Sequence, residues 1–451
     1  MTLFDKINNR TATIGIVGLG YVGLPHAVAF AAAGFPVLGI DVNGERVAAI
    51  NRGESQIPDV SSEQLAPLVA AHRLSASTDP SHLVEADVML ICVPTPFDDM
   101  KTPDLRYIVA AAQGIAANLR PDTMVILQST TYPGTTEEVV QPILERSGLL
   151  AGRDFHLVFS PERIDPGNRQ YSAHNIPKVV GGLTAQCTEL ACALFGHLTP
   201  DIHAVSTPRA AEMTKLLENI FRSVNIAMVN ELAVLMERMQ IDIWEVIDAA
   251  RTKPFGFMAF TPGPGVGGHC IPVDPYYLSW KAREFDFYTK FIELAAEVNA
   301  DMPDHVVRKV VAGLNMDGKP LLGSTVLILG VAFKRDIDDA RNSPAQRVIE
   351  LLLDAGANIE YHDPFVPTFR TGGNALHRRP TTLRSVSLDE GLNAADAVVI
   401  LTGHTAVDYA EVVSRVRVVV DAVNVTGQLA DASDHVIRLG APMPASLAAR
   451  L

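Results

Sequence analysis

The 451-residue chain has few cysteines, and their placement excludes two kinds of site. None of the four, Cys92, Cys187, Cys192 and Cys270, stands in a CxxC pair or at a metal-like spacing from histidine. We therefore expect neither a disulfide scaffold nor a metal site. Such cysteine usage fits a reducing, cytoplasmic setting best.

Long hydrophobic runs are also missing. The longest apolar stretches, residues 108–117 and 224–236, are interrupted by polar residues well before the roughly 18 residues that a membrane span needs. The polar amino terminus, MTLFDKINNRTAT, lacks the apolar segment of a signal peptide. We expect neither secretion nor a membrane span.

Positive charge is in deficit, because 37 Lys and Arg face 51 Asp and Glu and leave a net charge of −14. This balance argues against a general polyanion binder, so nucleic acid is not expected as a partner and a phosphate ligand would need a local pocket. The chain is longer than the roughly 250 residues at which one core stops growing, so two or three domains are expected.

Alternating strand and helix patterns are present at both ends of the chain. Over residues 1–205, runs such as TIGIVGL and DVMLICVP alternate with helical patterns, as in βαβ units around a parallel sheet. The alternation returns over 316–451 with TVLILGVAF and DAVVILTGH. We predict an α/β protein with two Rossmann-like open parallel sheets. The polar segment 368–384 could be a loop near a ligand or a surface excursion.

Residues 206–315 should be helical and join the two sheets. Thr207 and Pro208 supply an N-cap and a proline at the first helical position. Apolar residues then recur at three- and four-residue spacing as far as Met239, which predicts a long helix. We interpret this stripe as core, with part of it buried against a second subunit, so a homodimer or a higher homo-oligomer is expected.

The segment GLGYVG follows the first strand pattern and precedes an alanine-rich helix pattern. Gly18 permits a tight turn, Gly20 lets the backbone approach a pyrophosphate, and Gly23 allows the helix to pack on the strand. Asp41 ends the next strand, where a carboxylate can bind a ribose 2′-hydroxyl and would repel a 2′-phosphate. The pattern favours NAD over NADP, and the alternative is a packing turn without a ligand.

Four glycines and four prolines surround Cys270 in the segment TPGPGVGGHCIPVDPYYLSW. Such a loop brings backbone close to a ligand, and a helix should begin at Pro275. A thiol beside a helix N-terminus ionises readily, so Cys270 is a candidate nucleophile, whereas the other cysteines are interpreted as small buried hydrophobes. Asp274 is placed to cap the helix and could also serve chemistry.

Four further polar residues are candidates. Lys215 and Asn219 are four residues apart on the predicted long helix, so both could face one substrate oxygen. Glu162 and Lys334 each follow a strand pattern, and ligands bind at the strand ends of open α/β sheets. The alternatives are a solvated helix face and surface turns with ordinary ion pairs.

Seven segments between residues 18 and 343 together resemble the UDP-sugar 6-dehydrogenase (UDP-glucose/UDP-mannuronic acid dehydrogenase) family: GLGYVGLP, VPTP, QSTTYPGTT, SPERIDPGN, EMTKLLENIFRSVNIAMVNE, GPGVGGHCIPVDP and FKRDIDDARNS. The resemblance implies an NAD domain over 1–205, a dimerisation domain over 206–315 and a UDP-sugar-binding domain over 316–451. The chain looks most like the UDP-N-acetylglucosamine 6-dehydrogenases of bacterial surface-polysaccharide synthesis, since UDP-glucose enzymes usually carry an arginine near Phe255. UDP-N-acetylmannosamine and UDP-glucose are the alternatives.

The resemblance also implies a reaction, the oxidation of a C6 alcohol to a carboxylate with two NAD used in succession. Cys270 would trap the aldehyde as a thiohemiacetal that becomes a thioester, while Lys215 and Asn219 stabilise the developing negative charge on oxygen. The residues implied for water orientation and general-base chemistry are Asp274, Thr130 and Glu162.

Ligand contacts follow from the same resemblance. Cofactor contacts are implied for Gly18, Gly20, Tyr21, Val22, Gly23, Asp41, Arg46, Thr95, Thr130 and Arg341. Substrate contacts are implied for Glu162, Arg163, Lys215, Asn219, Gly267 and Lys334.

Two other functions compete with this one. A one-step hydroxyacid dehydrogenase of the same broad superfamily also carries a Lys-x-x-x-Asn pair, but it needs neither the cysteine nor a C-terminal nucleotide domain. A catalytically silent nucleotide-sugar binding protein would keep the fold, yet all the expected catalytic positions are filled here.

Overall fold

A computed structural model describes residues 1–57, 59–98, 101–163, 175–268, 270–429 and 435–444. The chain divides into two compact units. The N-terminal unit comprises Met1–Glu218 and Tyr276–Phe287, and the C-terminal unit comprises Asn219–Pro275 and Tyr288–Leu451. Each unit contains one of the two predicted sheets, so the predicted fold class is confirmed.

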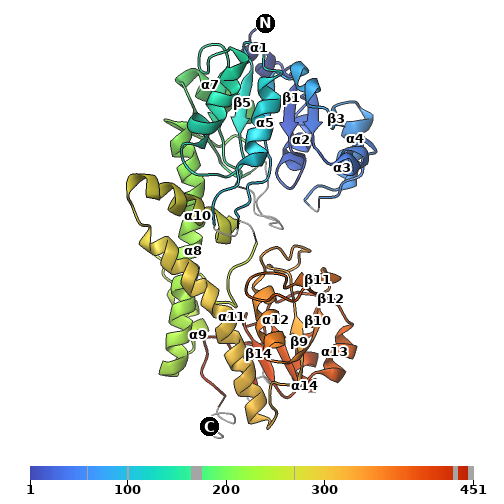
Figure 1. The fold of residues 1–451 in the computed structure, drawn as a ribbon, viewed down its shortest axis with the longest axis vertical. Helices are drawn as coiled ribbons and strands as arrows, with labels where there is room; N and C mark the ends of the chain where they lie inside the picture. Colours follow the sequence, from blue (N-terminus) through green and yellow to red (C-terminus); the bar gives the residue numbers. More distant parts are fainter. Residues whose placement is uncertain (58, 99–100, 164–174, 269, 430–434, 445–451) are drawn as a thin grey trace. The chain divides into compact units, whose positions relative to one another are not determined.

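The N-terminal unit is built on an eight-stranded sheet with the order β3-β2-β1-β4-β5-β6-β7-β8 (Figure 1). Neighbouring strands are parallel except β6 and β7. The order reverses direction between β1 and β4, and ligands of doubly wound sheets bind at the carboxyl ends of such strands. The strands are β1 (Ile14–Val17), β2 (Val37–Ile40), β3 (Leu74–Ser77), β4 (Val88–Ile91), β5 (Met124–Leu127), β6 (His156–Phe159), β7 (Lys178–Gly182) and β8 (Ile202–Val205).

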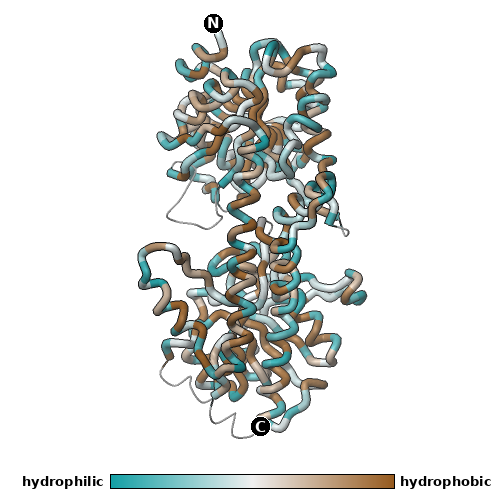
Figure 2. Tube along the Cα trace, turned by 90° about the vertical axis from the view of Figure 1, so that its left-hand side faces the viewer, coloured by the Kyte–Doolittle hydropathy of each residue, from teal (hydrophilic) through white to brown (hydrophobic). Residues whose placement is uncertain are grey.

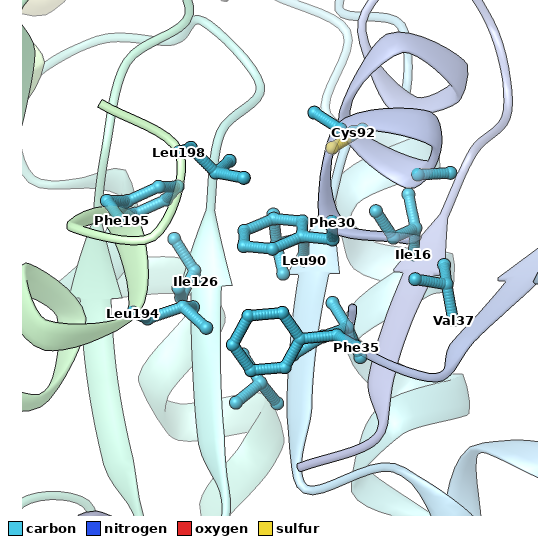
Figure 3. Packing of buried hydrophobic residues seen from close by; sticks show 14 of the residues in the cluster. Ile16, Phe30, Phe35, Val37, Leu90, Cys92, Ile126, Leu194, Phe195 and Leu198 are labelled. Carbon is cyan, nitrogen blue, oxygen red and sulfur yellow. The ribbon is translucent and has the colours of Figure 1, made fainter. Parts of the chain in front are cut away.

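Two hydrophobic layers cover the faces of this sheet. On one face Phe30, Phe35 and Phe195 pack over the strands in a hydrophobic cluster (Figure 3). Phe30 and Phe35 meet edge to face, with ring centroids 5.9 Å apart. The helices of that face are α1 (Leu3–Asn8), α2 (Gly23–Ala32) and α7 (Ala185–Phe195), and those of the other face are α5 (Arg106–Ala116) and α6 (Gln141–Leu144). Short helices α3 (Gly44–Asn51) and α4 (Ser62–Ala70) lie near β3.

The C-terminal unit contains a five-stranded parallel sheet with the order β10-β9-β13-β14-β15. Its direction reverses between β9 and β13. The strands are β9 (Thr325–Leu329), β10 (Asn358–His362), β13 (Ala397–Ile400), β14 (Val419–Asp421) and β15 (Val436–Arg438). Helices α11 (Lys290–Met316) and α12 (Pro344–Asp354) cover one face, and α13 (Leu388–Ala394) and α14 (Tyr409–Arg415) cover the other.

The polar segment 368–384, for which a ligand loop and a surface excursion were the two alternatives, contains an antiparallel pair of strands. β11 (Thr368–Thr371) pairs with β12 (Thr381–Arg384). No strand was predicted at β3 and β8, whose residues are only partly buried and therefore lack the continuous apolar run of the other strands. None of the helices in the described ranges has the length and apolarity that a membrane crossing needs.

The predicted long helix is α8 (Pro208–Met239), and Thr207 begins it as expected, since its side-chain oxygen accepts the N–H of Ala210 at 3.1 Å. Hydrophobic and hydrophilic segments alternate along the helices (Figure 2). α9 (Ile243–Ala250) follows α8. On α8, Phe221, Met228 and Leu235 are 45%, 49% and 48% exposed at a seven-residue spacing, so part of the apolar stripe is not core within one chain.

The prediction of a helix that begins at Pro275 was wrong. α10 (Cys270–Ala282) begins earlier, so Asp274 lies inside the helix and does not cap it. Pro272 falls in the first turn, where no N–H partner is needed, and Pro275 removes only one hydrogen bond of the helix. A proline-rich sequence therefore did not mark the helix start.

The close packing of Gly23 against Gly18, in the turn between β1 and α2, predicts that a larger residue at position 23 lowers the stability of the protein. A Cβ atom on Gly23 would lie 1.7 Å from the carbonyl oxygen of Gly18, closer than any non-bonded contact, whereas a Cβ on Gly20 would meet nothing within 4 Å. Gly23→Ala should lower the free energy of unfolding by about 1–3 kcal/mol, as overpacking does. Thermal unfolding followed by circular dichroism measures the change. Gly20→Ala is the matched control and should melt with the wild type, and equal melting of all three proteins would contradict this packing.

Candidate functional site

The turn between β1 and α2 has the geometry that a dinucleotide pyrophosphate requires. Gly18 adopts a φ of 93°, which favours glycine. The empty space beside Gly20 leaves room for a close ligand, while Val22 precedes the first residue of α2 and Tyr21 is exposed. The helix N-terminus next to this space attracts phosphate. The residues present therefore fit a dinucleotide.

Asp41 follows β2 and turns its carboxylate toward that turn. Its Oδ2 accepts the N–H of Leu19 at 2.8 Å and a hydrogen bond from Arg46 at 3.0 Å, and its Oδ1 accepts the N–H of Asn43 at 2.9 Å. The side chain is only 7% exposed. An acid held in this way stands where a ribose hydroxyl is expected, beside the glycine turn.

The two predicted cofactor-side threonines lie on the loops that follow β4 and β5, and β4 borders the reversal of the strand order. Thr95 is buried, and its carbonyl accepts a hydrogen bond from the hydroxyl of Tyr277. Thr130 is half-buried beside Ser129, whose hydroxyl donates to the carbonyl of Val93 at 2.8 Å. These bonds fasten the two loops to each other and to α10.

Glu212 was not among the predicted site residues, although it organises the loop that contains Thr130. Its buried carboxylate accepts the N–H of Gly134 at 2.6 Å and both the N–H and the hydroxyl of Thr136, at 2.9 and 2.7 Å. Burial raises the pKa of Glu212 to about 7, against the effect of these hydrogen bonds. A signal existed in the sequence, since Glu212 and Lys215 are three residues apart on one helix.

Glu162 lies after β6 with its carboxylate in a buried ionic network. Oε2 accepts from the ammonium group of Lys178 at 2.9 Å and lies 3.0 Å from Nε2 of His26. Nδ1 of His26 donates to the carbonyl of Val22 at 2.9 Å, because a carbonyl can only accept. The network therefore joins Glu162 to the dinucleotide turn.

This network sets the charge of Glu162. Burial alone would raise its pKa, but the charges of Lys178 and His26 outweigh burial and hold the pKa well below its ordinary value. A carboxylate kept ionised in this way is a weak base in this arrangement. Its predicted general-base role stays a prediction. Lys178 itself was missed, since only the fold brings two strands together at this point.

Asn219 and Asp274 are joined by a hydrogen bond, and Lys215 lies one turn before Asn219 on α8. Lys215 is 7% exposed and Asn219 is fully buried, so the alternative of a solvated helix face is excluded. Nδ2 of Asn219 donates to Asp274 at 2.6 Å, and Oδ1 of Asn219 accepts from Arg222 at 2.5 Å. Both ends of the amide are thus oriented, and α10 is tied to α8 one turn after Cys270.

Part of the predicted site lies outside the residues that the structure describes. The backbone of Cys270 begins α10, but its side chain, residue 269 and the part of SPERIDPGN after Arg163 lie outside the described residues. Arg163 forms an ion pair with Glu218 at 2.7 Å and donates to the carbonyl of Pro177. Its predicted substrate contact stays a prediction.

The glycine loop 261–268 is held against the loop 330–343 in the C-terminal unit. Gly268 donates its N–H to the carbonyl of Arg341 at 2.9 Å, and Asn342 donates to the carbonyl of Gly268 at 3.0 Å. A Cβ on Gly267 would lie 2.6 Å from Cβ of Phe333, so only glycine fits there. Arg341 itself forms a bidentate pair with Asp339.

The structure thus gathers the predicted residues into separate groups. Gly18, Gly20, Asp41, Thr95 and Thr130 lie at the strand ends of the N-terminal sheet. Lys334 is partly buried on the loop that follows β9 in the other sheet. In the ranges that the structure describes, no cluster of three or more His, Cys, Asp or Glu side chains is suited to a metal ion.

The buried ion pair of Glu162 predicts a pH-dependent stability. Lys178→Met leaves the carboxylate buried without its cation, which costs about 3–5 kcal/mol of unfolding free energy at neutral pH. The wild-type pair contributes fully above the ordinary glutamate pKa of 4.5 and loses its contribution as pH falls through the lowered folded pKa. In the variant the folded pKa is raised, so protonation relieves the loss and the difference from wild type should shrink between pH 7.5 and pH 5.5.

Urea unfolding at the two pH values measures this difference. Lys178→Arg keeps the positive charge and should lose less stability than Lys178→Met at pH 7.5. A loss that is equal at both pH values would show that Glu162 does not depend on Lys178 for its ionisation.

Comparison with known proteins agrees with this architecture. Three domain profiles of the UDP-glucose/GDP-mannose dehydrogenase family match: its NAD binding domain over residues 12–199, its central domain over 209–301 and its UDP binding domain over 327–428. The chain is 38% identical over 355 residues to a UDP-N-acetyl-D-glucosamine 6-dehydrogenase of Pseudomonas aeruginosa, covering 78% of this chain and 83% of that protein.

Two further relatives are similar over most of their length. A UDP-N-acetyl-D-mannosamine dehydrogenase of Escherichia coli K12 is 37% identical over 408 residues, covering 87% of this chain and 94% of that protein. The solved structure of a UDP-D-ManNAc dehydrogenase from Pyrococcus horikoshii superposes with a TM-score of 0.85 at 31% identity, covering 95% and 99% of the two chains. The chain therefore belongs to the UDP-glucose/GDP-mannose dehydrogenase family and is an NAD-dependent oxidoreductase of nucleotide sugars.

Proposed function

We propose that the chain oxidises the C6 hydroxyl of a UDP-N-acetylhexosamine, UDP-N-acetylglucosamine in particular, to the uronic acid. One observation carries the proposal. The hydrogen bond between Asn219 and Asp274 places α10, the helix that begins at Cys270, beside the α8 residue one turn after the buried Lys215. In the proposed site, α8 supplies the cation and the oriented amide, and α10 supplies the nucleophile.

The chemistry removes four electrons in two hydride transfers, and NAD, when bound, accepts a hydride. In the first step the C6–H hydride leaves and the hydroxyl proton passes to a base, which produces an aldehyde. The Cys270 thiol adds to the aldehyde carbon to form a thiohemiacetal. Loss of a second hydride produces a thioester, and water then cleaves the C–S bond. The alcohol, one water and two NAD⁺ thus become the carboxylate, two NADH and three protons.

The oriented side chains have defined roles in this scheme. Lys215 and Asn219 stabilise negative charge on the substrate oxygen, and removal of one such donor typically costs a factor of about 10²–10³ in kcat. Asp274 holds the amide of Asn219 so that one of its two hydrogens remains for the substrate. Thr130 and Asp274 orient water, and Glu162 is the proposed base, although its pairing with Lys178 lowers its basicity.

Ligand contacts complete the proposal. Tyr21, Val22, Arg46, Thr95 and Arg341 contact NAD, and Arg163, Gly267 and Lys334 contact the UDP-sugar. UDP-N-acetylmannosamine is the second candidate, because relatives of similar identity are named for each of the two sugars. The proposed setting is the cytoplasm, and the proposed pathway is surface-polysaccharide synthesis, with domains over 1–205, 206–315 and 316–451.

The decisive measurement is the amount of NADH formed per mole of limiting sugar nucleotide. With excess NAD, UDP-N-acetylglucosamine should yield two NADH, and UDP-N-acetylmannosamine and UDP-glucose should react more slowly. One NADH per sugar would indicate a single alcohol-to-carbonyl step and would remove Cys270 from the mechanism. No NADH with tight UDP-sugar binding would indicate a silent binding protein.

Substitution of the nucleophile tests the covalent step separately. Cys270→Ser should bind NAD and UDP-sugar with unchanged dissociation constants but lose steady turnover by several orders of magnitude, because a hydroxyl forms the covalent intermediate poorly. Cys192→Ser, on α7 of the N-terminal unit, is the control and should keep its activity. Full turnover by Cys270→Ser would contradict the mechanism.

We also infer that α8 pairs with a second copy of the chain. The exposed Phe221, Met228 and Leu235 recur every seven residues, as in a helix that packs lengthwise against another helix. Met228→Glu combined with Leu235→Glu should convert a dimer into a monomer, measured by light scattering during size-exclusion chromatography. The control is Glu231→Gln, an exposed position on the same helix. An unchanged mass in the double variant would contradict this interface.

A further inference from the structure

The loop 330–343, which follows β9 and contains Lys334, is held in an unusual backbone conformation. Gly330, Asp336 and Asn342 have positive φ values of 82°, 59° and 49°. A left-handed conformation is unfavourable for a non-glycine residue and persists where the surroundings hold it. The groups that impose it are therefore part of how this loop presents its side chains.

Buried side chains from two other loops hold its first half. Oδ2 of Asp363, the residue after β10, accepts the N–H groups of Val331 and Ala332 at 2.8 and 3.0 Å. The hydroxyl of Thr402 donates to the carbonyl of Ala332 at 2.6 Å. Nδ1 of His404 accepts the N–H of Asp336 at 3.0 Å. Each of these hydrogen bonds is made to a backbone group, so together they determine the backbone conformation of the loop.

The hydrogen bonds define the tautomer of His404. A backbone N–H can only donate, so Nδ1 carries no proton and the ring proton is on Nε2. That nitrogen lies 3.1 Å from Oδ2 of Asp363 and donates to it. His404 and its Asp363 contact are fully enclosed, since neither side chain is exposed to solvent. His404 is thus a fixed connector with no remaining hydrogen-bonding nitrogen.

Asp363 is committed to the same task. Besides His404 and the two N–H groups of the loop, its Oδ1 accepts the N–H groups of Phe365 and Val366 at 2.8 and 3.0 Å. Burial opposes ionisation, but the hydrogen bonds from His404 and the backbone outweigh it and lower the pKa of Asp363 to about 2. Five donors occupy this carboxylate, so it organises protein backbone.

His404 lies at the edge of the C-terminal parallel sheet where open α/β sheets bind their ligands. The strand order reverses between β9 and β13, and His404, on the loop after β13, contacts Asp336, on the loop after β9. The carboxylate of Asp336 also accepts the N–H and the hydroxyl of Thr405, at 2.9 and 3.0 Å. The two loops that flank the reversal are therefore joined, and Lys334 lies two residues before the joint.

From this arrangement we propose that His404, held by Asp363, is a positioning residue that sets the shape of residues 331–336 and thereby the affinity for the UDP portion of the substrate. The proposal rests on the proposed function, in which the loop after β9 contacts the UDP-sugar through Lys334. The proposed role affects binding and not the hydride or thiol chemistry. It therefore predicts a higher KM for the UDP-sugar at an unchanged kcat.

The test compares binding of UDP alone with steady-state kinetics in the full-length protein. In His404→Gln we expect a UDP dissociation constant and a KM for the UDP-sugar at least 10-fold higher than in the wild type. The KM for NAD and kcat should change by less than twofold. A merely structural defect would lower kcat through loss of active protein and leave both UDP parameters unchanged.

A second variant avoids dependence on a fully buried position. Asp336→Ala removes the bonds to Thr405 at a partly exposed site and should raise the same two parameters in the same direction. His435→Gln, which loses a hydrogen bond to the carbonyl of Val413 elsewhere in the unit, is the control and should bind UDP as the wild type does.

The outcomes separate this inference from the proposed function. If the wild type binds UDP and both His404→Gln and Asp336→Ala bind it equally well, the positioning role is overturned. If the wild type itself binds no UDP, the proposed function fails first. A His404→Gln protein that does not fold leaves the decision to Asp336→Ala.

Discussion

Buried carboxylates that accept backbone N–H groups hold the loops of this protein in place. A loop without regular structure still has N–H groups that need partners, and a charged acceptor forms stronger hydrogen bonds than a carbonyl does. Asp41 accepts from the glycine turn after β1, Glu212 from the loop after β5, and Asp363 from the loop after β9. Each acid thus replaces the hydrogen-bond ladder that a strand or helix would have supplied.

The charge of each carboxylate depends on what surrounds it. Asp363 has five hydrogen-bond donors, and its pKa is about 2, whereas Glu212 has three and a pKa of about 7. Glu162 stays ionised because Lys178 supplies a positive charge. Burial thus raises the pKa of Glu212 to about 7, on the helix that also contains Lys215.

The two sheets use the same architecture for different purposes. Both have an acid after the second strand of their parallel core, Asp41 and Asp363, and both acids accept N–H groups from the turn after the first strand. In the N-terminal sheet the turn enters α2 directly and leaves open space at Gly20 for a ligand. In the C-terminal sheet a longer loop intervenes before α12, and its shape depends on side chains from neighbouring loops.

The sequence by itself determined the features that depend on residues close together in the chain. Strand and helix periodicity predicted both parallel sheets and α8, and the spacing of Gly18, Gly20 and Gly23 predicted the dinucleotide turn, because these patterns act within one or two elements. Only the tertiary structure decided the rest. It placed Asp274 inside α10, joined β6 to β7 in an antiparallel pair, and paired Glu162 with Lys178. The contact between His404 and Asp363 spans 41 residues. Such contacts depend on which strand ends the packed core brings together, and no local pattern encodes that proximity.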